Sequence, residues 1–156
     1  MALAPTLQKY LADHGVTYDV IPHRRTTSSL DTVETSHIPA DCFAKGILLR
    51  DRQGYWLAVL PASRHVQLSD LRTALGDSVA LASEEEVAEV FTDCARGAIP
   101  PFGECYGLDA IVDSSIDQQP ELYCEGGDHE TLVHMSQPEF ARLNRQARRG
   151  SFTGAT

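Results

Sequence analysis

Lys45 is the residue whose type and setting point most directly to chemistry. It stands inside the short apolar run Phe43–Arg50. If this run is a strand, side chains alternate between its two faces, and Lys45 shares one face with large apolar residues. The small residues Ala44 and Gly46 then leave the other face open to close approach by another segment.

The sequence leaves two interpretations of Lys45 open. A buried ammonium needs a partner or an opening to water, because an unpaired buried charge is costly. Lys45 either lies in a cleft, where it binds a phosphate or a carbonyl oxygen, or packs its stem at a sheet edge while the ammonium reaches solvent. The pattern favours neither.

The segment Gly97–Gly103 is a second candidate for chemistry. Pro100 and Pro101 stiffen it, and glycines let its backbone come close to a ligand. Free backbone N–H groups in a rigid loop stabilise a developing oxyanion. The two prolines supply no N–H, so the candidate donors are Gly97, Ala98, Ile99, Phe102 and Gly103. The alternative is an ordinary tight turn.

The segment Gly126–Glu130 places His129 beside a Gly-Gly turn, where it lines a pocket or lies on the surface. His134 follows five residues later, which is one place too far for the zinc motif HExxH, and no metal site is predicted. A nucleophile elbow, a P-loop and a Rossmann glycine pattern are also missing. A hydrolase built on this sequence would therefore position water or use a group of its own substrate.

The remaining pattern predicts the elements that must hold these residues. Helices are expected over residues 6–14, from Ser28 or Ser29, over 69–75, and after the capping boxes that begin at Ser83 and Ser136. Strands are expected over residues 16–21, 43–50, 55–60, 108–112, 122–125 and 131–135. This order predicts one α+β domain over residues 1–150, with a mixed, largely antiparallel sheet flanked by helices. Residues 151–156 are expected to form a frayed tail.

Composition narrows the class of protein. The chain has 156 residues and a net charge of −9, which argues against a general nucleic-acid coat. Arg142, Arg145, Arg148 and Arg149 form a local basic run that either touches phosphate or is a solvated surface. The four cysteines match no zinc pattern and are expected to be reduced and buried. Without a signal-peptide or membrane-span pattern, the cytoplasm is the expected location and no membrane contact is expected.

Together these segments resemble the YbaK family of aminoacyl-tRNA deacylases, which includes the freestanding YbaK and ProX-type deacylases and the editing domain inserted in bacterial prolyl-tRNA synthetase. The resemblance spans about Thr6 to Leu143 and is carried by short motifs in the family's order. These motifs are Pro22-His23, Phe43-Ala44-Lys45, Leu57–Ala62, Gly97–Pro101, Gly127–Glu130 and Val133–Ser136. One position departs from the pattern, because many members have Thr or Asn where this chain has Gly46.

The resemblance implies a barrel-like mixed sheet and a trans-editing hydrolase that needs no cofactor. Its substrate would be the 3′ end of a mischarged tRNA carrying a small amino acid such as Ala, Ser or Cys, with tRNA-Pro a candidate. The implied catalytic residues are Lys45, Gly97, Ala98, Ile99 and Pro101. The implied substrate-binding residues are His23, Thr27, Gly46, Arg64, Phe102 and His129. A synthetase or an elongation factor is the candidate partner, and a monomer is the expected state.

Two alternatives remain at this stage. A shared fold does not fix function, so the chain could be a binding module for an aminoacyl-tRNA end or a synthetase, without catalysis. The other alternative is a thiol hydrolase that uses Cys105 or Cys42, with His23 or His129 as the base. A thiolate-activating context is not evident around either cysteine.

Overall fold

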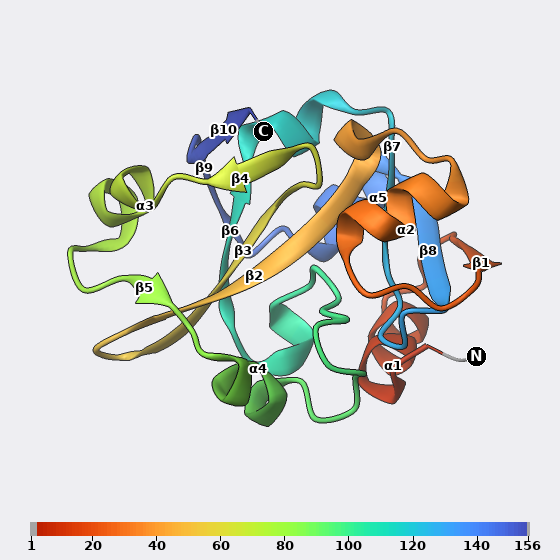
Figure 1. Cartoon of the computed structure of the whole chain (residues 1–156), viewed down its shortest axis with the longest axis horizontal. Coiled ribbons are helices and arrows are strands. Elements are labelled where there is room, and N and C mark those ends of the chain that lie inside the picture. Colours follow the sequence, from red (N-terminus) through yellow and green to blue (C-terminus); the bar gives the residue numbers. More distant parts are fainter. Residues whose placement is uncertain (1–2, 156) are drawn as a thin grey trace.

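The computed structural model describes residues 3–155 (Figure 1). Its helices are α1 Pro5–Asp13, α2 Ser29–Ser36, α3 Leu68–Leu75, α4 Glu84–Val90 and α5 Gln137–Leu143, with short 3-10 turns η1 Ala40–Cys42, η2 Glu104–Tyr106 and η3 Ser114–Gln118. Its strands are β1 Asp19–Pro22, β2 Phe43–Asp51, β3 Gly54–Pro61, β4 Arg64–Val66, β5 Ala80–Leu81, β6 Asp109–Asp113, β7 Glu121–Glu125, β8 Thr131–Ser136, β9 Arg148–Gly150 and β10 Thr153–Ala155. Within residues 3–155, every helix is too short or too polar to cross a membrane.

The main sheet is mixed and mostly antiparallel, as the sequence predicts. Its strand order is β1-β8-β7-β2-β3-β6-β9, and β5 pairs with β2. The pairs β7·β2, β3·β6 and β6·β9 are parallel, while the others are antiparallel. The expectation of a barrel-like sheet needs correction, because β1 and β9 remain as two edges and the sheet is open.

The predicted hairpin is confirmed and positions Lys45. Strands β2 and β3 pair from Ala44–Pro61 down to Asp51–Gly54, which sets Lys45 opposite Leu60. On its other side, β2 pairs with β7 at Phe43 and Ala44. Lys45 therefore lies on an interior strand, one residue beyond the part of β2 that pairs with β7.

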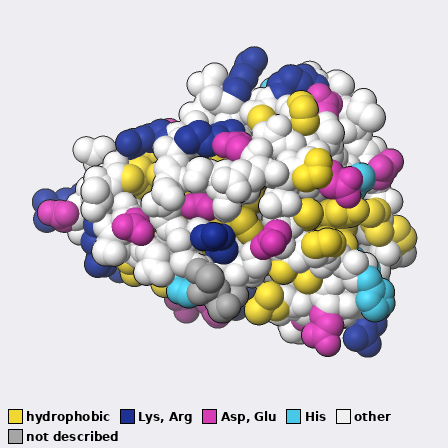
Figure 2. All heavy atoms as spheres, turned by 90° about the horizontal axis from the view of Figure 1, so that it is seen from above, with side chains coloured by type: hydrophobic (Ala, Val, Ile, Leu, Met, Phe, Trp, Pro, Cys, Tyr) yellow, Lys and Arg dark blue, Asp and Glu magenta, His cyan; other side chains and the backbone are white. Residues whose placement is uncertain are grey.

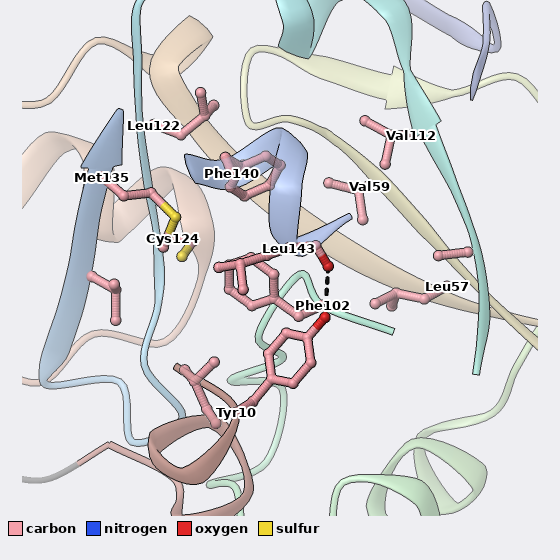
Figure 3. Close-up of a cluster of buried hydrophobic side chains, with 14 of the residues drawn as sticks. Tyr10, Leu57, Val59, Phe102, Val112, Leu122, Cys124, Met135, Phe140 and Leu143 are labelled. Carbon is pink, nitrogen blue, oxygen red and sulfur yellow. Dashed lines mark hydrogen bonds between the residues drawn. The ribbon is translucent and has the colours of Figure 1, made fainter. Parts of the chain in front are cut away.

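Helices and loops cover both faces of the sheet. On one face α1, α5 and the loop around Phe102 bury the largest cluster, in which Tyr10 donates a hydrogen bond to the carbonyl of Leu143 at 2.7 Å (Figure 3). On the other face α3 and Phe152 pack on alternate residues of β3, such as Ala58 and Leu60. This layering holds β2 rigidly between two apolar cores.

The predicted helix caps are largely confirmed. The Ser28 side chain accepts from the Asp31 N–H at the start of α2, and Ser83 and Glu86 form the full reciprocal box before α4. Before α5, Ser136 caps the helix. The Glu139 carboxylate instead accepts a hydrogen bond from the Thr17 N–H at 2.7 Å. This bond connects α5 to the segment before β1.

The expected frayed tail is wrong for the part of it that the structure describes. Phe152 is buried, and its N–H donates to Asp113 at 3.0 Å. Residues 153–155 form β10, which pairs with β4. Burial of one aromatic side chain and a two-stranded ladder stabilise this segment against fraying. Residue 156 lies outside the described residues.

Candidate functional site

Lys45 is half-buried and has no counter-ion among the described residues. No hydrogen bond or ion pair joins its ammonium to any residue in the described range 3–155. Burial lowers the pKa of Lys45 below its ordinary value, because the charged form loses hydration. An ammonium in this state favours an anionic or carbonyl-oxygen ligand.

Lys45 lines a small pocket where three loops meet the sheet. The lining residues come from the start of α2, from β2, from the loop after α4 and from the turn after β7: Ser28, Ser29, Phe43, Lys45, Gly46, Gly97, Ile99, Glu125 and His129. The cavity holds about 20 Å³. A space of ~10–15 Å³ already admits one water, so this is a small cavity.

The loop after α4 presents backbone donors to this pocket. Gly97 has φ +79°, a conformation that favours glycine, and the Ala98 N–H donates to the Ala95 carbonyl at 2.9 Å. Among residues 3–155, the N–H groups of Gly97 and Ile99 have no such partner. Among the residues that line the pocket, the candidate donors are therefore Gly97 and Ile99, and the expectation that Ala98 supplies one needs correction.

Gly46 allows this loop to approach the sheet. A Cβ atom at position 46 would lie 3.1 Å from both Ile99 Cγ2 and Leu57 Cδ1, which is too close for easy packing. The predicted close approach on the small-residue face is thus confirmed, and the approaching residue is Ile99. Ile99 also lines a neighbouring cavity of about 280 Å³ beside α4, so its side chain separates the two spaces.

His129 joins three segments at the pocket. It is buried, and its backbone has φ +62°. Its Nε2 donates to the Arg96 carbonyl at 2.6 Å, and its own carbonyl accepts the Thr26 N–H at 3.1 Å. A carbonyl only accepts hydrogen bonds, so Nε2 carries a proton. His129 therefore fixes the relative position of the loops around residues 26, 96 and 129.

Glu125 completes this network and was missed by the sequence analysis. Its Oε1 accepts the N–H groups of Gly127 and His129 at 3.0 and 3.1 Å. Ser28 and Ser29, the candidate caps of α2, also line the pocket. A signal for Glu125 was present in the sequence, since an acidic residue at the end of an apolar strand, directly before Gly-Gly, must find donors in the turn that follows.

Several predicted site residues do not line the pocket. Phe102 is fully buried and packs on Phe140 with ring centres 5.3 Å apart, and Ala98 and Pro101 are also buried. Arg64 lies in β4 and donates to the Thr153 hydroxyl at 3.1 Å. Phe102 and Arg64 therefore contact other parts of the chain, and neither lines the Lys45 pocket.

His23 and Thr27 lie beside the pocket without lining it. The His23 N–H donates to the Glu130 carbonyl at 2.8 Å, and its ring Nδ1 lies 2.6 Å from the Arg24 carbonyl. The exposed Thr27 precedes the cap of α2, and its N–H donates to Asp31. Both residues support the chain segment that carries Ser28 and Ser29.

The cysteines do not form a nucleophilic centre with the pocket. All four are free, but only Cys124 is fully buried. Burial raises the pKa of Cys105 to about 12 and also raises the pKa of Cys42. Neither thiol lines the Lys45 pocket, which removes the geometric basis of the thiol-hydrolase alternative. Within residues 3–155, no group of three or more His, Cys, Asp and Glu side chains is arranged to hold a metal ion.

The surface charges are mixed. On the face shown in Figure 2, Lys and Arg are interspersed with Asp and Glu, and a hydrophobic area covers the end of the molecule that holds α2 and β8. Val20 and Leu30 are exposed large apolar residues at this end. The described residues on this face do not form the continuous basic surface that drives nonspecific nucleic-acid binding.

Comparison with models of protein families assigns the chain to one family. The model of the aminoacyl-tRNA editing domain matches residues 23–143, which span every lining residue of the pocket. The chain therefore belongs to the aminoacyl-tRNA editing domain family. No protein with a curated description matches the sequence.

Solved structures share the fold at low sequence identity. A protein described as a proposed trans-editing enzyme for prolyl-tRNA synthetase superimposes with a TM-score of 0.83 at 21% identity, covering 97% of each chain. The hypothetical protein APE2540 gives 0.83 at 17% identity, covering 96% of this chain and 99% of its own. A scaffold protein from epitope grafting by computational design gives 0.84 at 18% identity, covering 98% and 97%. At these identities the likeness establishes the fold, which is the YbaK-like editing fold that the sequence predicts.

Proposed function

We propose that the chain is a trans-editing deacylase that hydrolyses the ester between a small amino acid and the 3′ end of a mischarged tRNA. The observation that carries the proposal is the Lys45 ammonium, which has no partner among residues 3–155 and lines one pocket with Gly97 and Ile99. A cation and free N–H groups around one cavity favour a carbonyl oxygen that becomes an oxyanion.

The proposed reaction uses water and groups of the chain and substrate. Water attacks the ester carbonyl carbon, helped by a ribose hydroxyl of the tRNA. Lys45 and the N–H groups of Gly97 and Ile99 stabilise the tetrahedral oxyanion. The carbon–oxygen bond to the ribose then breaks, and the ribose oxygen takes a proton. The products are the free amino acid and a tRNA with its terminal hydroxyl restored.

Pocket size supports a small amino acid. A cavity of about 20 Å³ accommodates a methyl or hydroxymethyl group more readily than a long side chain. Alanine, serine and cysteine are therefore the proposed amino acids, with tRNA-Pro as the candidate carrier. The proposal extends to a cytoplasmic monomer that meets its substrate alone or docked on a synthetase or an elongation factor.

Deacylation of a panel of mischarged tRNAs tests the proposal. The panel carries Ala, Ser, Cys and Pro, and each ester is incubated with the wild-type chain and with Lys45→Ala. We expect the wild type to cleave at least one small ester and the variant to lose that activity. Binding of tRNA without turnover of any ester would instead support the binding-module alternative. Full activity on a tRNA that lacks the neighbouring ribose hydroxyl would overturn that part of the mechanism.

A further inference from the structure

The proposed reaction leaves one charged group of the pocket unused. Glu125 lies at the end of β7, is only 7% exposed, and lines the same cavity as Lys45. Buried carboxylates are rare unless they are paired. Each carboxylate oxygen of Glu125 therefore needs a hydrogen-bond donor, either from the chain or from a ligand.

Among residues 3–155, only one oxygen of Glu125 accepts hydrogen bonds. Oε1 accepts the two backbone N–H groups of the turn after β7, those of Gly127 and His129. Oε2 lies 3.8 Å from His129 Nδ1, which exceeds hydrogen-bond distance. Within the described part of the chain, no Lys or Arg nitrogen lies within 4.0 Å of either oxygen. Among residues 3–155, Oε2 thus has no donor within hydrogen-bond distance.

His129 does not fill this position. Its Nε2 already donates to the Arg96 carbonyl, so in the neutral ring Nδ1 is an acceptor and cannot donate to Glu125. Lys45 does not fill it either, because its ammonium forms no ion pair with Glu125. The pocket therefore presents a cation and a carboxylate as separate groups.

This separation matches the two polar groups of an aminoacyl ester. The ester carbonyl gains negative charge during hydrolysis, while the amino group next to it is an ammonium with three N–H donors. A carboxylate is the natural acceptor for that ammonium, and a hydrogen bond between charged groups is stronger than one between neutral groups.

We propose that Glu125 Oε2 binds the α-ammonium of the substrate and thereby restricts the enzyme to esters of free amino acids. This inference rests on the proposed deacylase function. It predicts discrimination against esters whose α-nitrogen is absent or acylated, such as hydroxyacyl-tRNA and peptidyl-tRNA.

A matched pair of substrates tests the proposal. Alanyl-tRNA and lactyl-tRNA differ only in carrying an ammonium or a hydroxyl at the same carbon, so both fit the same space. We expect the wild type to give a kcat/KM at least about 10-fold higher for alanyl-tRNA, after each value is divided by the spontaneous hydrolysis rate of that ester. If another amino acid emerges from the panel, its hydroxy analogue replaces lactate.

The variant Glu125→Gln separates recognition from structure. Gln keeps an oxygen for the N–H groups of Gly127 and His129 but has no negative charge. We expect kcat/KM for alanyl-tRNA to fall about 10- to 100-fold, while lactyl-tRNA changes less than about 3-fold. Equal loss on both esters would show that Glu125 only holds the turn, and that result would overturn the proposal.

The wild-type chain alone also decides the matter if the variant does not fold, as judged by circular dichroism. Equal corrected rates on the two esters would then refute ammonium recognition. Failure of the deacylase function looks different, because the wild type would cleave neither ester. In that case the role of Glu125 falls with the proposed function.

Discussion

The chain is acidic overall but has positive charge in two regions, at Lys45 and at the arginines after Glu139. The surroundings of these two regions differ. Arg142 is exposed, pairs with Glu139 at 3.2 Å and donates to the His14 carbonyl at 2.8 Å. Arg149 pairs with Asp117 at 3.0 Å. Lys45 is half-buried and has no such partner among residues 3–155. The fold thus satisfies two of the surface cations internally and leaves the pocket cation available for a ligand.

Two of the four arginines in the basic run have partners within the chain. The run was expected either to touch phosphate or to form a solvated surface. Arg142 and Arg149 hold α5 and the segment after it against neighbouring parts of the chain, which is a structural use of charge. Charge count along the sequence therefore indicates function less well than the absence of an internal partner.

Removing one positive charge from each region should produce the largest contrast. Lys45→Met and Arg149→Met lower the net charge equally. We expect Lys45→Met to reduce kcat/KM for the cleaved ester about 100-fold or more, because it removes a group that stabilises the oxyanion. Arg149→Met should stay within about 2-fold and lose only about 0–1 kcal/mol of unfolding free energy, as for most surface ion pairs.

Single-turnover deacylation and urea unfolding of both variants measure this contrast. A similar loss of activity in the two variants would mean that general attraction of tRNA, and not the position of Lys45, explains the effect. Such a result would remove the distinction between the two regions.

The next expected effect concerns the space beside Lys45. Gly46→Thr introduces the residue that many family members carry, but here the new Cβ would lie 3.1 Å from Ile99 and Leu57 side-chain atoms. We expect overpacking to cost about 1–3 kcal/mol of unfolding free energy. Displacement of the loop donors should also lower activity about 10-fold.

The double variant Gly46→Thr/Ile99→Ala is the matched control. Shortening Ile99 makes room for the threonine, so the unfolding free energy should recover relative to the single variant. Thermal unfolding and deacylation of the two variants check this. If Gly46→Thr is as stable and as active as the wild type, the loop does not depend on Gly46.

Local patterns in the sequence predicted much of the molecule. The hairpin that carries Lys45, the cap of α2 and the sharp loop from Gly97 depend on neighbouring residues, and all three are found. Periodicity and capping act over a few residues, which is why they can be recognised without a structure.

Features that depend on long-range packing could not be predicted in this way. The alternating pattern does not reveal that Phe102 enters the core or that Phe152 is buried by α3 and β6. The open edges of the sheet follow from parallel pairing of β9 with β6, between segments distant in sequence. Glu125 was missed because its partners are defined by the fold of the turn after β7.

The smallest expected effect is on stability, and its dependence on pH sharpens the contrast between the two regions. Burial lowers the folded-state pKa of Lys45 below its ordinary value of 10.5. At neutral pH both folded and unfolded chains bind this proton, and the folded state bears the cost of the buried charge. As pH rises through the lowered pKa toward 10.5, the unfolded state binds more protons than the folded state, so stability increases with pH on account of this group.

Lys45→Met lacks this titration, which gives a measurable difference between the two chains. The variant should be more stable than the wild type at pH 7, and the gap should narrow as pH approaches 10. Urea unfolding of both chains at several pH values measures the gap, and groups common to both chains cancel in the difference. Arg149→Met should show a gap of constant sign, because arginine stays charged over this range. If the difference in unfolding free energy between Lys45→Met and the wild type does not narrow with pH, the Lys45 ammonium is hydrated in the folded state. Desolvation would then not explain why this ammonium is available to a ligand.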